Sequence, residues 1–439
     1  MIDNNIISRH KALYHTFGCK LNFAETSAVA SQLAERGIVR VEPGETPDII
    51  VVNTCSVTEE ADKKCRQTVR SLARRYPDAA IAITGCYAQL KSDEAASLPG
   101  VVIVAGNDRK LQLPDLIEHW LTEHKPDVRI IPAKDITEFA PSCSRGDRTR
   151  YFLKVQDGCN YFCSYCTIPY ARGRSRSGTI DELVAQARKV AEDGGHEIVI
   201  TGVNIGDFGY GRTDNFFDLM RRLDEVEGID RYRISSIEPN LLTDEMIEWV
   251  ATSRSFMPHF HIPLQCGDDE VLRLMRRRYD SALFAHRVET IRHFIPDAFI
   301  GVDLIVGARG ETPERFENSA RFVESLPISR LHVFPYSERP GTRALTDIDI
   351  IVPQEEKHRR ARRMIDISDR KLRDFCSAFE GQTRKVLVEH TIHDGSIYGF
   401  TDNYIKVKLP EGSARPNTEI SVRLDKYDAE TDTMSATPL

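Results

Sequence analysis

The chain has 439 residues, of which 41% are hydrophobic and 28% are charged, and its formal net charge is −7. The length excludes a single ordinary domain, and the composition excludes a disordered or fibrous chain. No run approaches the roughly 18 apolar residues of a membrane span, and residues 1–18 lack the apolar segment of a signal peptide, so we expect a cytoplasmic protein without membrane contact.

Strands and helices alternate in the first part of the chain. Apolar, β-branched runs predict strands at 12–18, 48–54 and 79–85, and helical patterns follow at 22–36, at 57–75 and near Ala88. This order predicts an α/β domain over residues 1–125, in which helices form layers on both faces of a parallel sheet. Residues 126–148 are polar and irregular and are interpreted as a linker.

A second alternating region predicts the central domain, at residues 149–375. Six candidate strands begin at residues 151, 196, 231, 258, 299 and 330, with helical patterns between them. Six such units predict a partial (β/α)6 barrel, because a full barrel of this kind needs eight.

The pattern changes again near the C-terminus. A long charged helix is expected at 353–378, followed by four short strands, at 383–390, 396–400, 403–409 and 419–424, with glycine and proline turns between them. This pattern predicts a small all-β barrel of the OB type over residues 379–439. Aromatic and basic side chains on its strands are candidates for RNA contacts, although aromatic residues in short strands also form cores: Tyr398, Phe400, Tyr404, Lys406 and Lys408.

Three of the ten cysteines lie close together in the segment DGCNYFCSYC. Cys159, Cys163 and Cys166 have the spacing C-x3-C-x2-C and follow the first predicted barrel strand, where barrels bind ligands. Three thiolates on a [4Fe–4S] cluster leave one iron open to a substrate. The alternatives are a zinc site without its fourth ligand and an accidental cluster.

Three further cysteines each follow a predicted strand of the first domain. Cys19, Cys55 and Cys86 should meet, because the carboxyl ends of parallel strands lie at one edge of a sheet. We therefore predict a second cluster with three protein ligands, the alternative being three unrelated buried cysteines. Cys65, Cys143 and Cys376 are interpreted as packing or incidental residues.

The C-x3-C-x2-C run, with Tyr165 before its last cysteine, resembles the radical S-adenosylmethionine (SAM) superfamily. The resemblance implies that the open iron chelates SAM and that an electron from the cluster cleaves it to a 5′-deoxyadenosyl radical. Tyr165 and residues at later strand ends are then candidates for contacts with SAM, although each of the latter could equally cap its own loop: Gly202, Asn204, Glu238 and Gln265.

Two cluster sites followed by a small barrel resemble the methylthiotransferase family over nearly the whole chain. The motifs include TFGCKLN, VVNTCSVTEEAD, TGCYAQ and VFPYSERPGTRA. They are most similar to the branch that acts on N6-threonylcarbamoyladenosine at position 37 of tRNA. The alternative substrates are isopentenyladenosine in tRNA and an aspartate of a ribosomal protein. The resemblance implies that one SAM methylates a sulfur on the first-domain cluster. A radical from a second SAM then removes hydrogen from C2 of the adenine, and the methylthio group is transferred to that carbon.

The resemblance also implies partners. These are the anticodon stem-loop of tRNA, a sulfur donor and a reducing electron donor such as flavodoxin or ferredoxin. Arg172, Arg174 and Arg176 could steer the phosphates of the RNA. Two rival functions are a radical SAM enzyme whose second cluster only relays electrons and a non-catalytic iron–sulfur module that binds RNA.

Three positions in two loops depart from the family pattern. The turn at 307–312, GARGET, has Ala308 and Arg309 where phenylalanine and proline are usual, and Cys266 stands where serine is usual. These departures bear on the shape of the two loops, but they do not change either group of cysteines.

Overall fold

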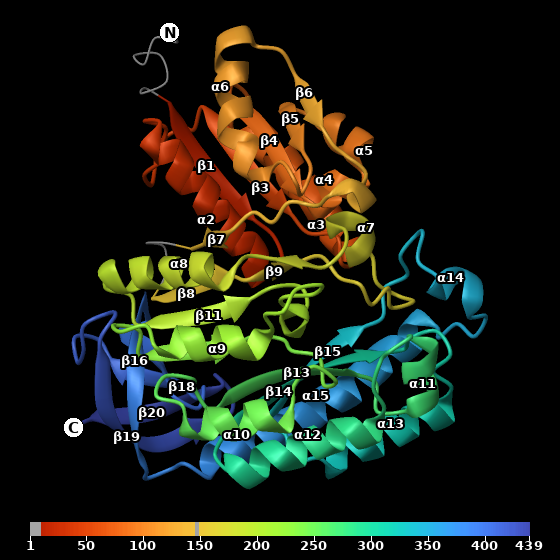
Figure 1. The fold of residues 1–439 in the computed structure, drawn as a ribbon, viewed down its shortest axis with the longest axis vertical. Coiled ribbons are helices and arrows are strands. Elements are labelled where there is room, and N and C mark those ends of the chain that lie inside the picture. Colours follow the sequence, from red (N-terminus) through yellow and green to blue (C-terminus); the bar gives the residue numbers. More distant parts are fainter. Residues whose placement is uncertain (1–9, 145–148) are drawn as a thin grey trace.

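Three regions follow one another along the chain in the computed structural model, which describes residues 10–144 and 149–439. Figure 1 shows an α/β domain at the top, an open barrel in the middle and a small all-β barrel beside the open barrel. The described residues do not include 1–9, where the sequence predicts no signal peptide, or 145–148, which belong to the predicted linker. Within the described residues, no helix has the length and apolar character to cross a membrane.

The first region is a three-layer domain on a six-stranded parallel sheet. The strand order is β2 (Val39–Arg40), β1 (Lys11–Thr16), β3 (Ile49–Thr54), β4 (Ala80–Gly85), β5 (Val101–Ala105) and β6 (Asp127–Arg129). The helices are α2 (Lys20–Glu35), α3 (Glu59–Arg75), α4 (Cys86–Leu90), α5 (Ser92–Ala96) and α6 (Leu113–Glu123). Alternate residues of β3 belong to different cores, one with α3 and one with α2 and α6, so helices cover both faces as predicted.

The sheet is larger than the three predicted strands. β2, β5 and β6 extend it, and all three pair in parallel with their neighbours. β6 lies inside the segment interpreted as a linker, so the start of that segment belongs to the sheet. A short 3-10 turn (Ala133–Asp135) and β7 (Ser142–Cys143) follow before the next region.

The central region is the predicted partial barrel. Its parallel strands are neighbours in chain order: β8 (Arg150–Lys154), β11 (Glu197–Thr201), β12 (Arg231–Ile234), β13 (His259–Gln265), β14 (Phe299–Val306) and β15 (Arg330–Pro335). Within the described residues, two isolated bridges, Tyr232 with Phe256 and Ser236 with His261, connect the sheet of β12 to the sheet of β13. β7 pairs antiparallel with β8. Shorter elements carry the loops at the strand ends: β9 (Gln156–Asp157), α7 (Ile168–Arg172), β10 (Arg176–Ser177), α11 (Asp269–Leu274) and α14 (Ala344–Asp347).

Helices cover the outside of the open barrel (Figure 1). They are α8 (Ile180–Glu192), α9 (Phe216–Asp224), α10 (Asp244–Thr252), α12 (Ser281–Phe294) and α13 (Pro313–Ser325). The long helix α15 (Gln354–Ser377) packs on β15 and leads to the last region.

The last region is a closed five-stranded barrel. Its order is β16 (Thr383–His393), β17 (Ser396–Thr401), β18 (Lys406–Pro410), β20 (Thr433–Pro438) and β19 (Glu419–Asp428), and β19 pairs back with β16. Four of these strands were predicted, and β20 was not. The fold class of all three regions is confirmed.

Candidate functional site

The C-x3-C-x2-C segment forms a tight loop between β9 and α7. Gly158 has a φ of +70°, and a Cβ atom there would lie 2.0 Å from the carbonyl oxygen of Arg174. Phe162 also adopts a left-handed conformation, with a φ of +51°. These two positions turn the chain back on itself and gather the three cysteines within one loop.

The three thiols of this loop share a hydrogen-bonded environment, in which Cys163 is buried and Cys159 and Cys166 are partly buried. The sulfurs of Cys159 and Cys166 each accept a backbone N–H at 3.4 Å, and the sulfur of Cys163 lies 3.2 Å from Nη1 of Arg277. Burial raises the pKa of all three thiols, that of Cys159 to about 12. Iron would have to displace these protons, and hydrogen bonds to the sulfurs are among the features that tune iron–sulfur clusters.

The other three cysteines meet at one edge of the first domain. Cys19 precedes α2, Cys55 follows β3 and Cys86 begins α4. A Cβ atom on Gly18 would lie 2.8 Å from the sulfur of Cys55, so the turns that carry Cys19 and Cys55 are in close contact. Burial, with smaller contributions from the neighbouring Cys86 and Cys19, raises the pKa of Cys55 to about 12.

The loop of Cys55 and the loop of Cys166 meet beside one cavity. The hydroxyl of Thr167, next to Cys166, donates to the carbonyl oxygen of Ser56, next to Cys55, at 3.4 Å. A cavity of about 310 Å³ is lined by Val57 and Thr58 from the first domain and by residues 165–168 from the cysteine loop. Its size falls within the range of small-molecule sites.

Two predicted SAM residues follow β11 and are fixed by Gln156. The side-chain oxygen of Gln156 accepts the backbone N–H groups of Val203 at 3.0 Å and of Asn204 at 2.8 Å. A Cβ atom on Gly202 would lie 2.9 Å from the carbonyl oxygen of Gln156. The amide of Asn204 is buried, and neither of its polar atoms has a hydrogen-bond partner within the described residues. A buried amide of this kind fits a site that takes a polar ligand.

Glu238 and Gln265 lie at the same end of the open barrel. Glu238 forms an ion pair with Arg277, and burial raises the pKa of its carboxyl group. Gln265 ends β13 at a bulge, with a φ of +64°, and lines the cavity between the cysteine groups. The hydroxyl of Tyr165 lies 3.4 Å from Nη1 of Arg277.

Arg277 is the residue of this site that sequence reasoning missed. It is almost fully buried and contacts Cys163, Tyr165 and Glu238, and its Nε donates to the hydroxyl of Tyr279 at 3.0 Å. The only signal in the sequence is the basic run MRRRY, which does not show which arginine points inward.

The prediction that Arg172 steers RNA phosphates is wrong. Its side chain is buried and binds Glu25 at 3.0 Å and Asp157 at 2.9 Å, and Glu25 also binds Lys110 and Lys154. This network joins the first domain to the open barrel. Arg174 is exposed and remains a candidate for phosphate contacts.

Two of the predicted RNA aromatics instead pack against the open barrel. The guanidinium of Arg150 lies 4.4 Å from the ring centre of Phe400 and donates to the hydroxyl of Tyr404 at 3.1 Å. Lys406 and Lys408 are exposed, and with Tyr398 they remain predictions.

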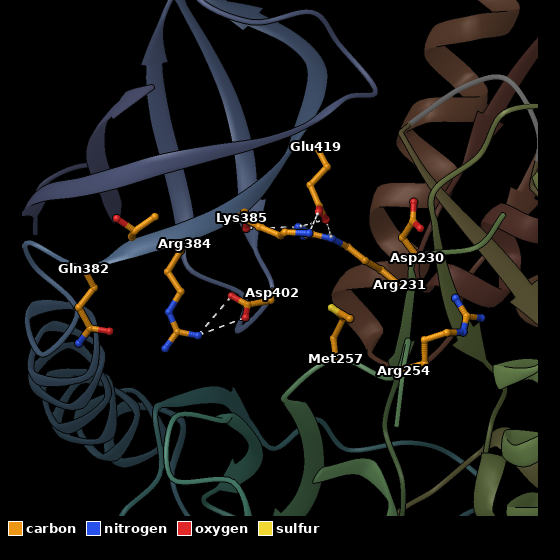
Figure 2. Close-up of a pocket in the computed structure, with 10 residues that line it drawn as sticks. Asp230, Arg231, Arg254, Met257, Gln382, Arg384, Lys385, Asp402 and Glu419 are labelled. Carbon is orange, nitrogen blue, oxygen red and sulfur yellow. Dashed lines mark hydrogen bonds and ion pairs between the residues drawn. The ribbon is translucent and has the colours of Figure 1, made fainter. Parts of the chain in front are cut away.

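Ion pairs also fill the groove at the junction of the two barrels. Figure 2 shows Arg231 reaching from the open barrel to Glu419, at 2.7 Å, while Arg384 pairs with Asp402 at 3.1 Å. Because its charges satisfy one another, we interpret this groove as a structural joint.

The two departures from the family pattern lie in one small core. Cys266 and Ala308 are both buried in the cluster that contains Met275 and Tyr279. Arg309 instead pairs with Glu338 at 3.0 Å. Cys266 and Ala308 therefore pack together, in a core against which Tyr165 of the cysteine loop also packs.

A single metal ion is a poor fit to either group of cysteines. Within residues 10–144 and 149–439, no three histidine, cysteine, aspartate or glutamate side chains lie close enough together to hold one ion. A cluster of several irons has a different requirement, because each thiolate binds its own iron. The donor set of three thiols at each site fits such a cluster better than zinc.

Known proteins resemble this chain over most of its length. Residues 11–106 match the Uncharacterized protein family UPF0004, and residues 153–323 match the Radical SAM superfamily. The chain is 39% identical to the threonylcarbamoyladenosine tRNA methylthiotransferase MtaB of Bacillus subtilis, over 90% of this chain and 89% of that protein. It is 33% identical to the tRNA-2-methylthio-N(6)-dimethylallyladenosine synthase of Thermobifida fusca, over 85% of this chain and 76% of that protein.

Solved structures resemble the chain in fold. The radical S-adenosylmethionine methyltransferase TsrM from Kitasatospora setae superimposes with a TM-score of 0.55 at 13% identity, over 74% of this chain and 72% of TsrM. The cobalamin-dependent S-adenosylmethionine radical enzyme OxsB gives a TM-score of 0.50 at 14% identity, over 77% of this chain and 55% of OxsB.

Proposed function

The chain belongs to the radical SAM methylthiotransferases, and on this basis we propose that it adds a methylthio group to C2 of N6-threonylcarbamoyladenosine at position 37 of tRNA. The observation that supports the proposal is the contact between the loops of Cys55 and Cys166 beside one cavity, through the hydrogen bond from Thr167 to Ser56. A methylthiotransferase needs a source of radicals and a source of sulfur close to the same adenine.

Each group of three cysteines would hold one [4Fe–4S] cluster. Cys159, Cys163 and Cys166 would leave one iron open for SAM, and Cys19, Cys55 and Cys86 would leave one open for sulfur. The clusters and SAM supply the radical chemistry that an unactivated adenine C–H bond requires, while the protein aims them. The mainly apolar walls of the cavity, such as Val57, Ile168 and Ile305, would keep water away from the reacting atoms.

The residues at the barrel strand ends would hold SAM. The unpaired amide of Asn204 offers both a donor and an acceptor, and Gly202 lets the backbone approach closely. Glu238 and Gln265 would bind polar groups of SAM from the neighbouring strands. Arg277 would position Glu238, Tyr165 and the loop of Cys163 relative to one another.

The proposal includes the partners expected from the sequence. These are the anticodon stem-loop of a tRNA, a sulfur donor and a reducing electron donor such as flavodoxin or ferredoxin, all in the cytoplasm. The exposed Arg174, at 5.6 Å from the ring centre of Phe162, and the exposed lysines of the closed barrel would contact the RNA.

A second candidate substrate is isopentenyladenosine in tRNA. The similarity to the Thermobifida fusca protein favours it, since that protein is named as a dimethylallyladenosine synthase. The relatives reported above give no support to an aspartate of a ribosomal protein.

Analysis of tRNA nucleosides tests the proposal. Digested tRNA from a strain without this gene should lack 2-methylthio-N6-threonylcarbamoyladenosine and accumulate the unmethylthiolated nucleoside, and a plasmid copy should restore the product. Loss of the methylthio derivative of isopentenyladenosine instead would support the second candidate. An unchanged nucleoside profile would contradict both.

A further inference from the structure

A second cavity occupies the interior of the open barrel. It has a volume of about 780 Å³ and is lined by strands β13, β14 and β15, by the closed barrel and by the first residue of α2. Its polar and aromatic wall includes Lys20, His261, Asp303, Arg330, His332 and Phe334. Neither the proposed clusters nor the proposed SAM contacts use this space.

This interior cavity borders the cavity between the cysteine groups. Asp303 and Phe334 line both of them. Lys20 lies on the wall of the interior cavity and directly follows Cys19 in the chain. A molecule whose reacting atom lies between the cysteine groups can therefore extend a substituent into the open barrel.

Most charges in the interior cavity already have partners. Arg330 binds Asp432 at 2.9 Å, and His261 binds Asp303 at 2.7 Å. His332 stacks on His261, and burial lowers its pKa, so the ring is neutral at pH 7. None of these groups needs a ligand to satisfy it.

Lys20 differs from these groups. Across residues 10–144 and 149–439 its ammonium has no hydrogen-bond or ion-pair partner, although Asp303 and Tyr404 lie close enough to act on its charge. Lys406 also lines the cavity, but it is exposed to water and lies over the ring of Tyr398. The partly buried Lys20 is thus the cation that a ligand anion would stabilise.

We propose that the interior cavity binds a carboxylate on the N6 substituent of the substrate adenosine, with Lys20 as its cation and the half-exposed Phe334 as a stacking surface for the base. This inference rests on the proposed function and names the residue that selects its substrate. The threonylcarbamoyl group carries a carboxylate, whereas the isopentenyl group is apolar and would leave Lys20 without a partner.

Binding of synthetic anticodon stem-loops tests this inference without a turnover measurement. The reconstituted full-length protein is titrated with three RNAs that differ only at position 37: threonylcarbamoyladenosine, its carboxylate methyl ester, and unmodified adenosine. The parent should bind the free carboxylate about tenfold or more tightly than the ester, as expected when one partner of a desolvated charge pair is lost. Lys20→Met should bind the two equally, and Lys20→Arg should regain part of the preference.

Lys406→Met is the matched control, because it removes a lysine from the exposed rim of the same cavity. It should weaken all three RNAs alike, or none of them, and keep the preference for the carboxylate. Thermal unfolding of each variant checks that it is folded. If Lys20→Met does not fold, the preference of Lys20→Arg for the carboxylate over the ester still tests the inference.

Two outcomes would overturn the inference. One is a parent that binds the ester as tightly as the carboxylate, and the other is a Lys20→Met variant that keeps the parent's preference. Either outcome leaves the proposed function standing if the tRNA nucleosides show the threonylcarbamoyl product. If they show the isopentenyl product, the proposed substrate itself fails.

Discussion

Arg277 contacts several functional groups around the site of Cys159, Cys163 and Cys166. Its guanidinium contacts a cysteine sulfur, a tyrosine hydroxyl and the Glu238 carboxylate, while its side chain is only 3% exposed. A buried ion pair contributes little compared with an apolar pair, but removing one partner leaves the other buried and unsatisfied.

Arg277→Met should therefore destabilise the protein strongly. We expect the free energy of unfolding to fall by about 3–5 kcal/mol, and the double variant Arg277→Met/Glu238→Gln to recover part of the loss. Denaturant titrations of the apoprotein measure both. Arg276→Met is the control, because Arg276 is exposed and pairs with Asp347 at the surface, so it should change the value by less than about 1 kcal/mol. Equal losses in the single and double variants would mean that the ion pair is not what stabilises Arg277.

At the residue scale, the strand-end positions of Cys19, Cys55 and Cys86 could be predicted from the sequence, whereas the burial of Arg172 could not. A cysteine at the end of a parallel strand must lie at the sheet edge, whatever the rest of the chain does. One partner of Arg172 is Glu25, which lies 147 residues earlier. No local pattern could reveal that contact, so a basic run interpreted as a surface contained a buried residue.

At the scale of elements, the first domain is joined to the open barrel by buried charges from α2, α7 and β8. Burial alone would raise the pKa of Glu25, but Arg172, Lys110 and Lys154 outweigh it and hold the pKa well below its usual range. A carboxyl group with a lowered pKa stabilises the fold fully above its unfolded pKa, and this contribution is lost as the pH falls through the folded pKa.

Glu25→Gln should accordingly weaken this junction in a pH-dependent way. At pH 7 the variant should be less stable than the parent by about 3–5 kcal/mol, because three buried cations lose their shared anion. The difference should shrink as the pH falls below about 4.5, where Glu25 of the unfolded parent takes up its proton. Unfolding midpoints of both proteins from pH 7 to pH 3 measure this trend, and a difference that stays constant with pH would contradict it.

The turn between β4 and α4 should control whether Cys86 can join its group. Gly85 has a φ of +100°, and a Cβ atom there would lie 2.3 Å from the carbonyl oxygen of Thr54. Gly85→Ala should displace Cys86 and remove about four of about eight irons from the reconstituted protein. Gly44→Ala is the control, because Gly44 has a φ of +92° but no atom within 4 Å of the added Cβ. Equal iron in both variants would show that the turn does not hold the ligand in place.

The elements that could be predicted were the strongly apolar ones. β3 and β4 are buried along their whole length, and their sequences, IIVVNT and AIAITG, are mostly apolar. β2 has two exposed residues, and β20 has the sequence TMSATP, in which only alternate side chains are apolar and buried. Such strands form because a neighbour offers unpaired backbone groups, which local sequence does not show.

At the scale of the whole molecule, the loop after β15 holds the first domain over the open barrel. Arg339 is buried and binds the hydroxyl of Ser56 at 2.8 Å and the carboxylate of Asp62 at 2.9 Å. These contacts fix the loop of Cys55 above the strand ends that carry the other cysteines. The arrangement allows a division of labour between two sites in one cavity.

Cys55→Ala should separate the two roles. The variant should still cleave SAM when reduced, because Cys159, Cys163 and Cys166 are intact, but it should transfer no methylthio group to tRNA. Chromatography of 5′-deoxyadenosine and of the digested RNA measures both. Loss of SAM cleavage in a variant that retains the iron of the Cys159 site would favour the rival in which the second cluster relays electrons.

The central claim is that this chain holds two independent [4Fe–4S] clusters, and the iron and sulfide content after anaerobic reconstitution tests it most directly. The parent should contain about eight irons, and the triple variants Cys19→Ala/Cys55→Ala/Cys86→Ala and Cys159→Ala/Cys163→Ala/Cys166→Ala should contain about four each. About four irons in the parent and none in the second variant would show that Cys19, Cys55 and Cys86 bind no cluster, and would contradict the account.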